Sequence, residues 1–228
     1  MKIYGLEKLS MVDFEGHLCC TVFTGGCNFR CPFCQNSDLV KIENLCMVDE
    51  NDFFNFLRKR KGILDSVCVS GGEPTLQNDL AEFLKKLKQE NYLVKLDTNG
   101  TKPELIKSLV KNGLVDYIAM DIKNAPSAYD KTAGGSVDLN AIKKSVEMLK
   151  NNLVPHEFRT TLVAGYHSQC EIEEIGKWLK GEDKIFLQKF VDGGTCLKKG
   201  LKEVPKVEAE KFKKILQNYI CHVELRGY

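Results

Sequence analysis

Short apolar, β-branched stretches alternate along the chain with longer amphipathic ones. Six of the short stretches have the length and composition of buried strands. They span residues 19–24, 66–70, 93–98, 117–122, 157–163 and 185–190. Between them, apolar residues recur at three- and four-residue spacing, for example at Leu80, Phe83, Leu84 and Leu87. This spacing predicts helices whose apolar faces belong to the hydrophobic core.

Strands that alternate with helices predict an α/β fold with a parallel sheet and right-handed crossovers. At about 30 residues per strand–helix unit, the chain has room for roughly six units, whereas a closed barrel of eight units takes ~250 residues. We therefore expect an open, partial (β/α)6 TIM-like barrel in a single domain, residues 1–228. Residues 1–18 form a lead-in, residues 19–190 the barrel core, and residues 201–228 a closing helix and strand.

Composition narrows the class of protein. With 43% hydrophobic and 28% charged residues, the chain has the balance of an ordinary globular protein. Its basic residues are scattered in short groups, such as residues 58–61, which are typical of a solvated helix face, so we expect no nucleic-acid partner. The start has no apolar region typical of a secretory signal, and no apolar run approaches the ~20 residues that span a bilayer. We expect a cytoplasmic protein that does not engage a membrane.

Three of the ten cysteines, Cys27, Cys31 and Cys34, lie on one loop directly after the first predicted strand. In a reducing compartment, such a group indicates a metal site rather than disulfides. Three thiolates can hold a four-iron cluster and leave one iron without a protein ligand. Zinc is the alternative, because Cys46 or His17 could complete a tetrahedral site. The remaining cysteines are dispersed among apolar residues, where we expect them to pack as small hydrophobic side chains.

Two further polar segments follow predicted strands, at the end of the sheet where barrels of this kind carry their chemistry. Gly71 and Gly72 let the backbone approach a ligand closely, and the Glu73 carboxylate can pair with an ammonium group. A plain turn before a helix that begins at Pro74 explains the same residues. The next strand ends in Asp-Thr-Asn-Gly, residues 97–100, which suits either ligand binding or the capping of a helix.

Together these motifs resemble the radical S-adenosylmethionine superfamily, whose signature is a C-x3-C-x2-C loop with an aromatic residue, here Phe33, before the last cysteine. The resemblance implies that Cys27, Cys31 and Cys34 bind three irons of a [4Fe-4S] cluster. It also implies that the amino and carboxylate groups of S-adenosylmethionine chelate the fourth iron. One electron then cleaves the sulfonium and yields a 5′-deoxyadenosyl radical.

The same resemblance implies where S-adenosylmethionine is bound. The Gly-Gly-Glu segment matches the family motif that holds the methionine amino group, and the strand ends near residues 97–99 and 121–123 match those of glycyl radical enzyme activators. The expected contacts are Phe33, Gly71, Gly72, Glu73, Asp97, Thr98, Asn99, Asp121, Lys123, Arg159 and Gln188. For Asp121 and Lys123, a structural salt bridge is the alternative interpretation.

From residue 1 to residue 16 and through the cysteine loop, the chain resembles the activating proteins of anaerobic ribonucleoside-triphosphate reductase. The resemblance implies abstraction of a hydrogen from a glycine Cα of that partner enzyme, and an electron donor of the flavodoxin or ferredoxin type. A pyruvate formate-lyase activating enzyme is the nearest alternative. A radical enzyme that acts on a small molecule, such as a deazaguanine synthase, is another. A non-catalytic metal or electron-transfer module is the last, and it would leave the strand-end motifs idle.

Overall fold

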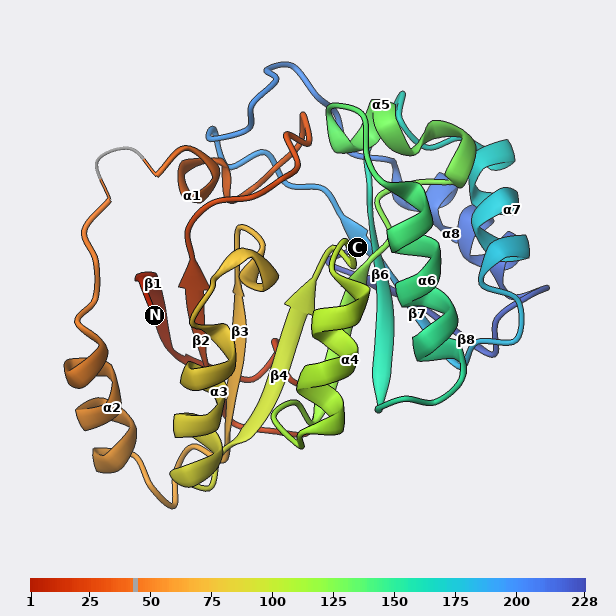
Figure 1. Ribbon diagram of the computed structural model, residues 1–228. Helices are drawn as coiled ribbons and strands as arrows, with labels where there is room; N and C mark the ends of the chain where they lie inside the picture. The colour runs from red at the N-terminus through yellow and green to blue at the C-terminus, as the bar shows by residue number, and fades with distance from the viewer. Residues whose placement is uncertain (43–44) are drawn as a thin grey trace.

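A computed structural model describes residues 1–42 and 45–228, and its strands form one sheet in which spatial order follows sequence order (Figure 1). The strands are β1 (Ile3–Ser10), β2 (Cys19–Thr24), β3 (Ser66–Gly71), β4 (Leu93–Thr98), β5 (Tyr117–Asp121), β6 (His156–Leu162), β7 (Lys184–Lys189) and β8 (His222–Arg226). Strand β1 pairs with β2 in antiparallel fashion, and every later pair is parallel. Within the described chain β1 and β8 are not paired, so the barrel is open on one side.

Helices cover the outer face of this curved sheet (Figure 1). They are α1 (Ser37–Lys41), α2 (Glu50–Lys59), α3 (Leu80–Gln89), α4 (Pro103–Lys111), α5 (Tyr129–Ala133), α6 (Leu139–Lys150), α7 (Gln169–Trp178) and α8 (Lys206–Leu216), with short 3-10 helices η1 (Pro74–Leu76) and η2 (Pro126–Ala128). The apolar stripe predicted on α3 is fully buried, because it packs on the sheet. No helix in the described ranges has the length and apolarity needed to cross a membrane.

The predicted fold class is confirmed, and each of the six predicted strands agrees with the structure to within one residue at either end. Two strands lie outside that set. Part of the predicted lead-in is strand β1, which forms one edge of the sheet and pairs with β2. The predicted closing helix and strand are α8 and β8, and β8 extends the parallel part of the sheet by one strand.

Successive side chains of each strand point to opposite faces, and the two faces differ in polarity. In β4, Val94 and Leu96 are fully buried in the main hydrophobic core, which lies between the sheet and the helices. The alternate residues Lys95 and Asp97 point into the barrel, where the Lys95 ammonium lies 3.4 Å from the carboxylate of Glu157 on β6. The interior is therefore a charged lumen rather than a second apolar core.

The loop between β1 and β2 closes the amino-terminal end of this lumen. Phe14 is buried there with Cys19 and Cys68, and its ring centroid lies 5.3 Å from that of Tyr117. Because these apolar side chains block the amino-terminal end, a ligand can reach the lumen only at the carboxyl-terminal ends of the strands or through the open side of the barrel.

Candidate active site

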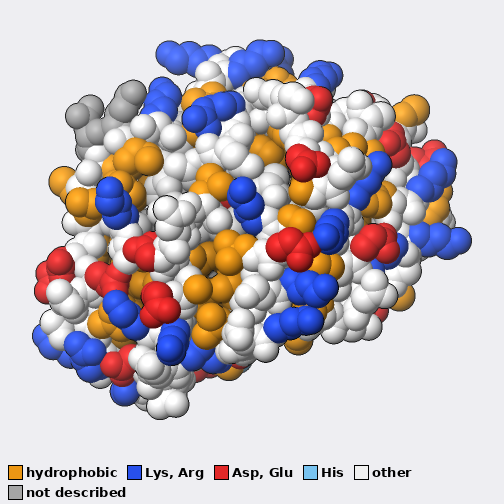
Figure 2. All heavy atoms as spheres, viewed as in Figure 1, with side chains coloured by type: hydrophobic (Ala, Val, Ile, Leu, Met, Phe, Trp, Pro, Cys, Tyr) orange, Lys and Arg blue, Asp and Glu red, His pale blue; other side chains and the backbone are white. Residues whose placement is uncertain are grey.

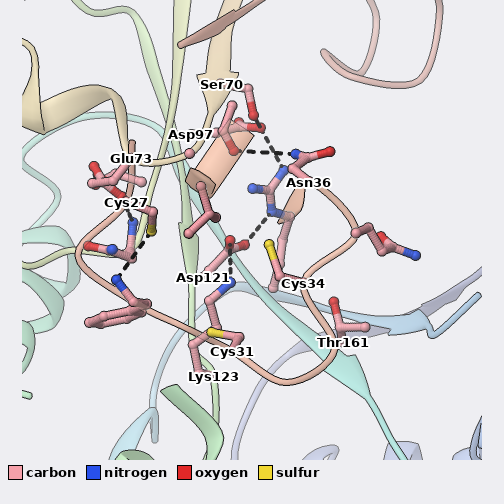
Figure 3. Close-up of a pocket in the computed structure, with 18 of the residues that line it drawn as sticks. Cys27, Cys31, Cys34, Asn36, Ser70, Glu73, Asp97, Asp121, Lys123 and Thr161 are labelled. Carbon is pink, nitrogen blue, oxygen red and sulfur yellow. Dashed lines mark hydrogen bonds and ion pairs between the residues drawn. The ribbon is translucent and has the colours of Figure 1, made fainter. Parts of the chain in front are cut away.

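The three-cysteine loop follows β2 directly and curves over a cavity of about 290 Å3 (Figure 3). Cys31 is buried, Cys27 and Cys34 are half-buried, and all three are free thiols. The backbone N–H of Phe29 donates to Cys27 Sγ at 3.3 Å. All three sulfur atoms therefore belong to one site.

The outer side of the loop is fixed by Arg30 and by the end of α5. Arg30 Nη1 donates to the carbonyls of Cys27 at 2.6 Å and Phe29 at 2.8 Å, and its backbone N–H donates to Ala133 O at 2.8 Å. Gly134 ends α5 at φ +80°, and a Cβ there would lie 2.0 Å from Arg30 O. Only glycine permits this close approach, because other residues rarely adopt that backbone conformation and would clash.

The described residues do not form a site for a single zinc ion. Among the described residues, no three His, Cys, Asp or Glu side chains are arranged to hold one ion. Zinc requires all its ligands within ~2.3 Å of one point, whereas in an iron–sulfur cluster the thiolates bind different irons. His17 is paired with Asp65 at the amino-terminal end of the sheet, and Cys46 is an exposed residue outside the cavity lining. Neither proposed fourth zinc ligand therefore reaches the loop.

Burial and a neighbouring charge act in opposite directions on these thiols. Burial raises the pKa of Cys31 to about 11, and it also raises the pKa of Cys27 and Cys34. The Lys123 ammonium lowers the pKa of each thiol, although by less than burial raises it. A positive charge so close favours the thiolate form that iron requires.

The two glycines after β3 allow the cysteine loop to cross directly against them. Gly71 has φ +120°, and a Cβ on it would lie 2.3 Å from Thr24 N; a Cβ on Gly72 would lie 2.0 Å from Gly26 O. Backbone hydrogen bonds join the segments, from Gly72 N to Thr24 O at 2.9 Å and from Glu73 N to Gly26 O at 2.8 Å. The close approach predicted for a ligand is thus made, in the first place, by the protein's own backbone.

The Glu73 carboxylate connects the end of β3 with the end of β4. It is 1% exposed, and it accepts hydrogen bonds from Thr75 N at 3.1 Å, Thr75 Oγ1 at 2.5 Å, Thr98 Oγ1 at 2.8 Å and Asn99 N at 2.7 Å. Burial raises the pKa of Glu73, while these hydrogen bonds work against that rise. Pro74 opens η1, for which Glu73 is the N-cap, so the turn interpretation also describes this segment. Binding of the methionine ammonium by Glu73 stays a prediction.

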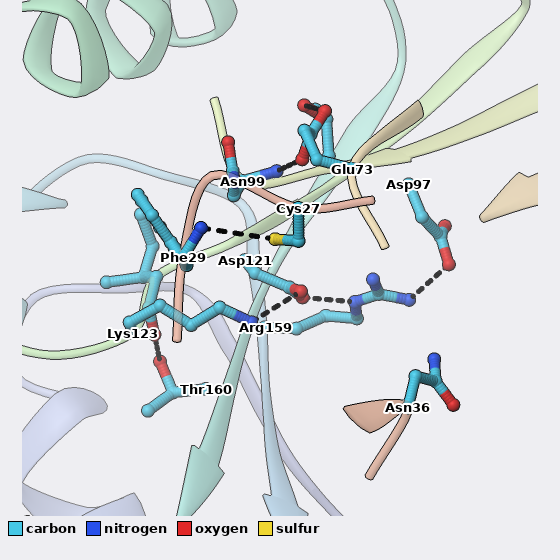
Figure 4. A network of polar contacts seen from close by, with 12 residues as sticks. Cys27, Phe29, Asn36, Glu73, Asp97, Asn99, Asp121, Lys123, Arg159 and Thr160 are labelled. Atoms are coloured by element: carbon cyan, nitrogen blue, oxygen red, sulfur yellow. Dashed lines mark hydrogen bonds and ion pairs between the residues drawn. The ribbon is translucent and has the colours of Figure 1, made fainter. Parts of the chain in front are cut away.

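Four charged side chains alternate in sign across the cavity floor (Figure 4). Arg159 donates from Nη1 to Asp97 Oδ2 at 3.1 Å and from Nε to Asp121 Oδ1 at 3.0 Å, and Lys123 Nζ donates to Asp121 Oδ2 at 2.9 Å. Although burial opposes ionisation, the charges of Arg159 and Lys123 hold the pKa of Asp121 at about 2. Asp121 is therefore ionised at neutral pH, and the ion pairs orient the four side chains relative to each other.

The structure brings every predicted site residue to this one cavity. The lining includes the three cysteines and all the expected contacts, from Phe33 on the cysteine loop to Gln188 on β7. Several lining residues were missed by sequence reasoning: Asp13, Phe23, Asn36, Ser70 and Thr161. Ser70 and Thr161 carried a signal, because each lies two residues from another inward-facing strand position. Asp13 carried none, since only the path of the β1–β2 loop brings it into the lumen.

Comparison with known proteins identifies the class to which this fold and site belong. The family model of the radical SAM superfamily matches residues 21–179, and the chain belongs to that superfamily. Its enzymes use a [4Fe-4S] cluster and S-adenosylmethionine, so the family and both cofactors inferred from the sequence are confirmed.

Individual relatives define the subgroup. The chain is 33% identical, over 98% of its length and 95% of the relative's, to a Methanocaldococcus jannaschii protein assigned provisionally as a glycyl-radical enzyme activating enzyme. It is 30% identical to the pyruvate formate-lyase-activating enzyme of Staphylococcus aureus, with 80% of this chain and 77% of that protein covered.

Solved structures agree on the fold. Streptococcus suis SuiB bound to the precursor peptide SuiA matches with a TM-score of 0.70 at 16% identity, over 91% of this chain and 48% of that one. A domain of the Bacteroides vulgatus pyruvate-formate lyase-activating enzyme matches with a TM-score of 0.59 at 19% identity, over 71% of this chain and 99% of that one.

Proposed function

We propose that this radical SAM enzyme activates anaerobic ribonucleoside-triphosphate reductase by abstracting a hydrogen from a glycine Cα of that partner. The observation that carries the proposal is similarity to a glycyl-radical enzyme activating enzyme along 98% of the chain. The resemblance of residues 1–16 to reductase activators supports the choice of partner. Cys46 is the only cysteine between Cys34 and Ser66, so this interval has no second group of cysteines of the kind that holds an accessory cluster.

In this proposal Cys27, Cys31 and Cys34 hold the [4Fe-4S] cluster, and S-adenosylmethionine occupies the cavity beneath them. The reduced cluster supplies the electron that cleaves S-adenosylmethionine into methionine and a 5′-deoxyadenosyl radical. The charged array of the cavity floor has carboxylates that can pair with the amino group of the methionyl part and cations that can pair with its carboxylate. Because Asp121 and Arg159 are already held by neighbouring charges, binding requires little reorganisation of the site.

A second cavity, of about 500 Å3, supports a large substrate rather than a small one. It lies between the β1–β2 loop and β8, on the open side of the barrel, and shares Asp13, Arg159 and Gln188 with the first cavity. A glycine-bearing loop of a partner protein can enter here and place its Cα next to the cofactor site. The partner's loop would then fill the second cavity, next to S-adenosylmethionine in the first.

The test is electron paramagnetic resonance after anaerobic mixing of the reconstituted protein with S-adenosylmethionine, a reductant and the reductase. A glycyl radical on the reductase supports the proposal. The Cys27→Ala variant should give no radical and lose the cluster, whereas Cys170→Ala, which removes an exposed thiol on α7, should behave as the wild type.

A parallel mixture contains pyruvate formate-lyase, because similarity to the Staphylococcus aureus activating enzyme favours that client as the second candidate. A radical that forms only on the lyase overturns the choice of reductase. Formation of 5′-deoxyadenosine without a radical on either protein, together with turnover of a small molecule, overturns the activating function itself.

A further inference from the structure

Two segments from distant parts of the chain cover the outer side of the cysteine loop. One is α5, which accepts the backbone hydrogen bond of Arg30. The other joins β7 to α8, residues 190–205, and is called the capping loop below. Lys198 N in the capping loop donates to Pro32 O at 2.9 Å, and Gln35 Nε2 donates to Val191 O at 3.1 Å. Figure 1 shows the capping loop passing over the carboxyl-terminal end of the sheet, beside α5.

An aromatic pair links the cysteine loop to this outer surface. Phe33, one residue before Cys34, packs edge-to-face on Tyr166, with ring centroids 5.9 Å apart. Tyr166 is 9% exposed, and its ring carries Lys131 Nζ at 5.4 Å and Lys198 Nζ at 5.8 Å from the centroid. The aromatic pair thus connects the cysteine loop to a surface point between two lysines, one on α5 and one on the capping loop.

Positive charges without an ion pair lie on the cysteine loop, on α5 and on the capping loop. The exposed cations are Arg30, Lys131, Lys198, Lys199 and Lys202. None of them forms an ion pair with any residue in the described part of the chain, whereas Arg58 and Lys61 on a distant surface both pair with Glu90. Figure 2 shows Lys and Arg side chains gathered along the upper edge of the molecule, where Figure 1 places the capping loop.

The carboxylates of α5 and the capping loop offset only part of this charge. Glu203 is already paired with Lys189 at 2.9 Å. Asp130 accepts from Val137 N and Asp192 from Gly194 N, so two carboxylates without an ion pair stand against the five cations. Exposed lysines without an ion pair in the described part of the chain also occur elsewhere, for example Lys85 on α3 and Lys206, Lys211 and Lys214 on α8. The surface above the cysteine loop differs in that two of its cations, Lys131 and Lys198, lie over the Tyr166 ring that contacts Phe33 of the cysteine loop.

We propose that this basic surface, made by the five cations named above, is the docking site of an acidic one-electron carrier protein. The inference rests on the proposed function, which needs one electron delivered to the cluster. The step moves one electron from the carrier, which is oxidised, to the cluster, which is reduced, and no bond forms or breaks in it. Opposite charge on the carrier speeds encounter and sets its orientation. The open side of the barrel stays available for the partner's glycine loop.

The experiment uses the reconstituted holoprotein and a reduced acidic flavodoxin as the carrier. Lys198, Lys199 and Lys202 are changed together to Glu, and the matched control changes Lys85, Lys180 and Lys211 to Glu, three exposed lysines on other surfaces. Stopped-flow absorbance gives the second-order rate constant of cluster reduction, and calorimetry gives the affinity for oxidised flavodoxin, which requires no turnover.

We expect the capping-loop variant to be reduced at least ~10-fold more slowly at low ionic strength and to bind flavodoxin correspondingly more weakly. The difference should shrink at high salt, because ions screen the interaction. The control variant should stay within about twofold of the wild type. Equal rate constants and affinities for the two variants overturn the proposal. So does loss of binding to the partner enzyme with unchanged reduction by flavodoxin.

Reduction by dithionite separates this inference from the proposed function. A small reductant needs no docking surface, so the capping-loop variant should cleave S-adenosylmethionine with dithionite at the wild-type rate. Failure of the wild type itself to cleave S-adenosylmethionine with dithionite overturns the proposed function. If the Glu variant does not fold, the variant with Lys198, Lys199 and Lys202 changed to Gln replaces it in the same test. Cluster reduction by flavodoxin should then slow by a smaller factor, because the charge is removed rather than reversed.

Discussion

Replacement of Glu73 measures how much the buried carboxylate contributes to the architecture of the site. Its Oε1 accepts from Thr75 N, Thr75 Oγ1 and Thr98 Oγ1, and its Oε2 accepts from Asn99 N. Glu73→Ala removes all of these acceptors. Glu73→Gln keeps the Oε1 acceptor but turns an amide N–H toward the Asn99 N–H. The two variants therefore differ in how many buried donors they leave without a partner.

The magnitudes follow from those donors. A buried donor without an acceptor costs about 1–3 kcal/mol, so the Gln variant, with one such donor, should lose about 1–3 kcal/mol of unfolding free energy. For the Ala variant the costs of the individual unpaired donors do not add fully. In the wild type, burial of the Glu73 carboxylate, which raises its pKa, already offsets part of the stabilisation from its hydrogen bonds. We expect a loss of about 3–5 kcal/mol, because the buried backbone N–H groups of Thr75 and Asn99 each lose their acceptor at a cost of about 1–3 kcal/mol. In a chain of this size that lowers Tm by roughly 6–20 °C.

Thermal and urea unfolding of the metal-free protein, followed by circular dichroism under reducing conditions, measure these losses without the cluster. A Tm of Glu73→Ala within ~1 °C of the wild type would refute the reasoning, and so would a Gln variant less stable than the Ala variant. Calorimetric titration of the reconstituted variants with S-adenosylmethionine adds a second readout. If Glu73→Gln folds normally but loses affinity, the carboxylate also contacts the methionine ammonium.

Two further predictions concern the supports of the sheet and of the cysteine loop. His156 Nε2 lies 2.8 Å from Glu182 Oε2, and although burial opposes it, this carboxylate raises the pKa of His156. The stabilisation is therefore present below the unfolded pKa of ~6.5 and is lost as pH rises through the folded value. Urea unfolding should show a larger cost of His156→Gln at pH 6 than at pH 9, and a constant cost contradicts this. Gly134→Ala forces a Cβ against Arg30 O and should lower stability by about 1–3 kcal/mol, whereas Gly135→Ala, with open space around it, should be nearly neutral in thermal unfolding.

Local patterns in the sequence were enough to predict most of the strands, several of the helices and the chemistry of the cysteine loop. Strand boundaries follow from short apolar runs with polar residues at their ends, and this is a property of neighbouring residues alone. The spacing of Cys27, Cys31 and Cys34 is likewise local, because eight consecutive residues contain the whole group. The family comparison confirms the class of enzyme and the cofactors that these residues indicated.

Relations between distant residues were decided by the tertiary structure. Glycine is required at position 72 because the backbone of Gly26 crosses it, and the Glu73 carboxylate accepts hydrogen bonds from Thr98 on β4 and from Asn99. No pattern within one segment contains either contact. The ion pair between Lys95 and Glu157 depends on the curvature that brings β4 and β6 to one lumen.

The strand order and register of the sheet supply the physical reason for this division. A period of two along each strand sorts side chains into a helix-facing set and a lumen-facing set, and the sequence by itself carries that alternation. Which lumen-facing charges meet depends on how the strands are aligned: the register pairs Asp121 with Arg159, and the sheet's curvature brings Asp97 within reach of the same guanidinium. The sequence thus determined the six core strands, the helices with clear apolar stripes and the group of three thiols, while only the folded sheet decided which charges, glycines and loops surround them.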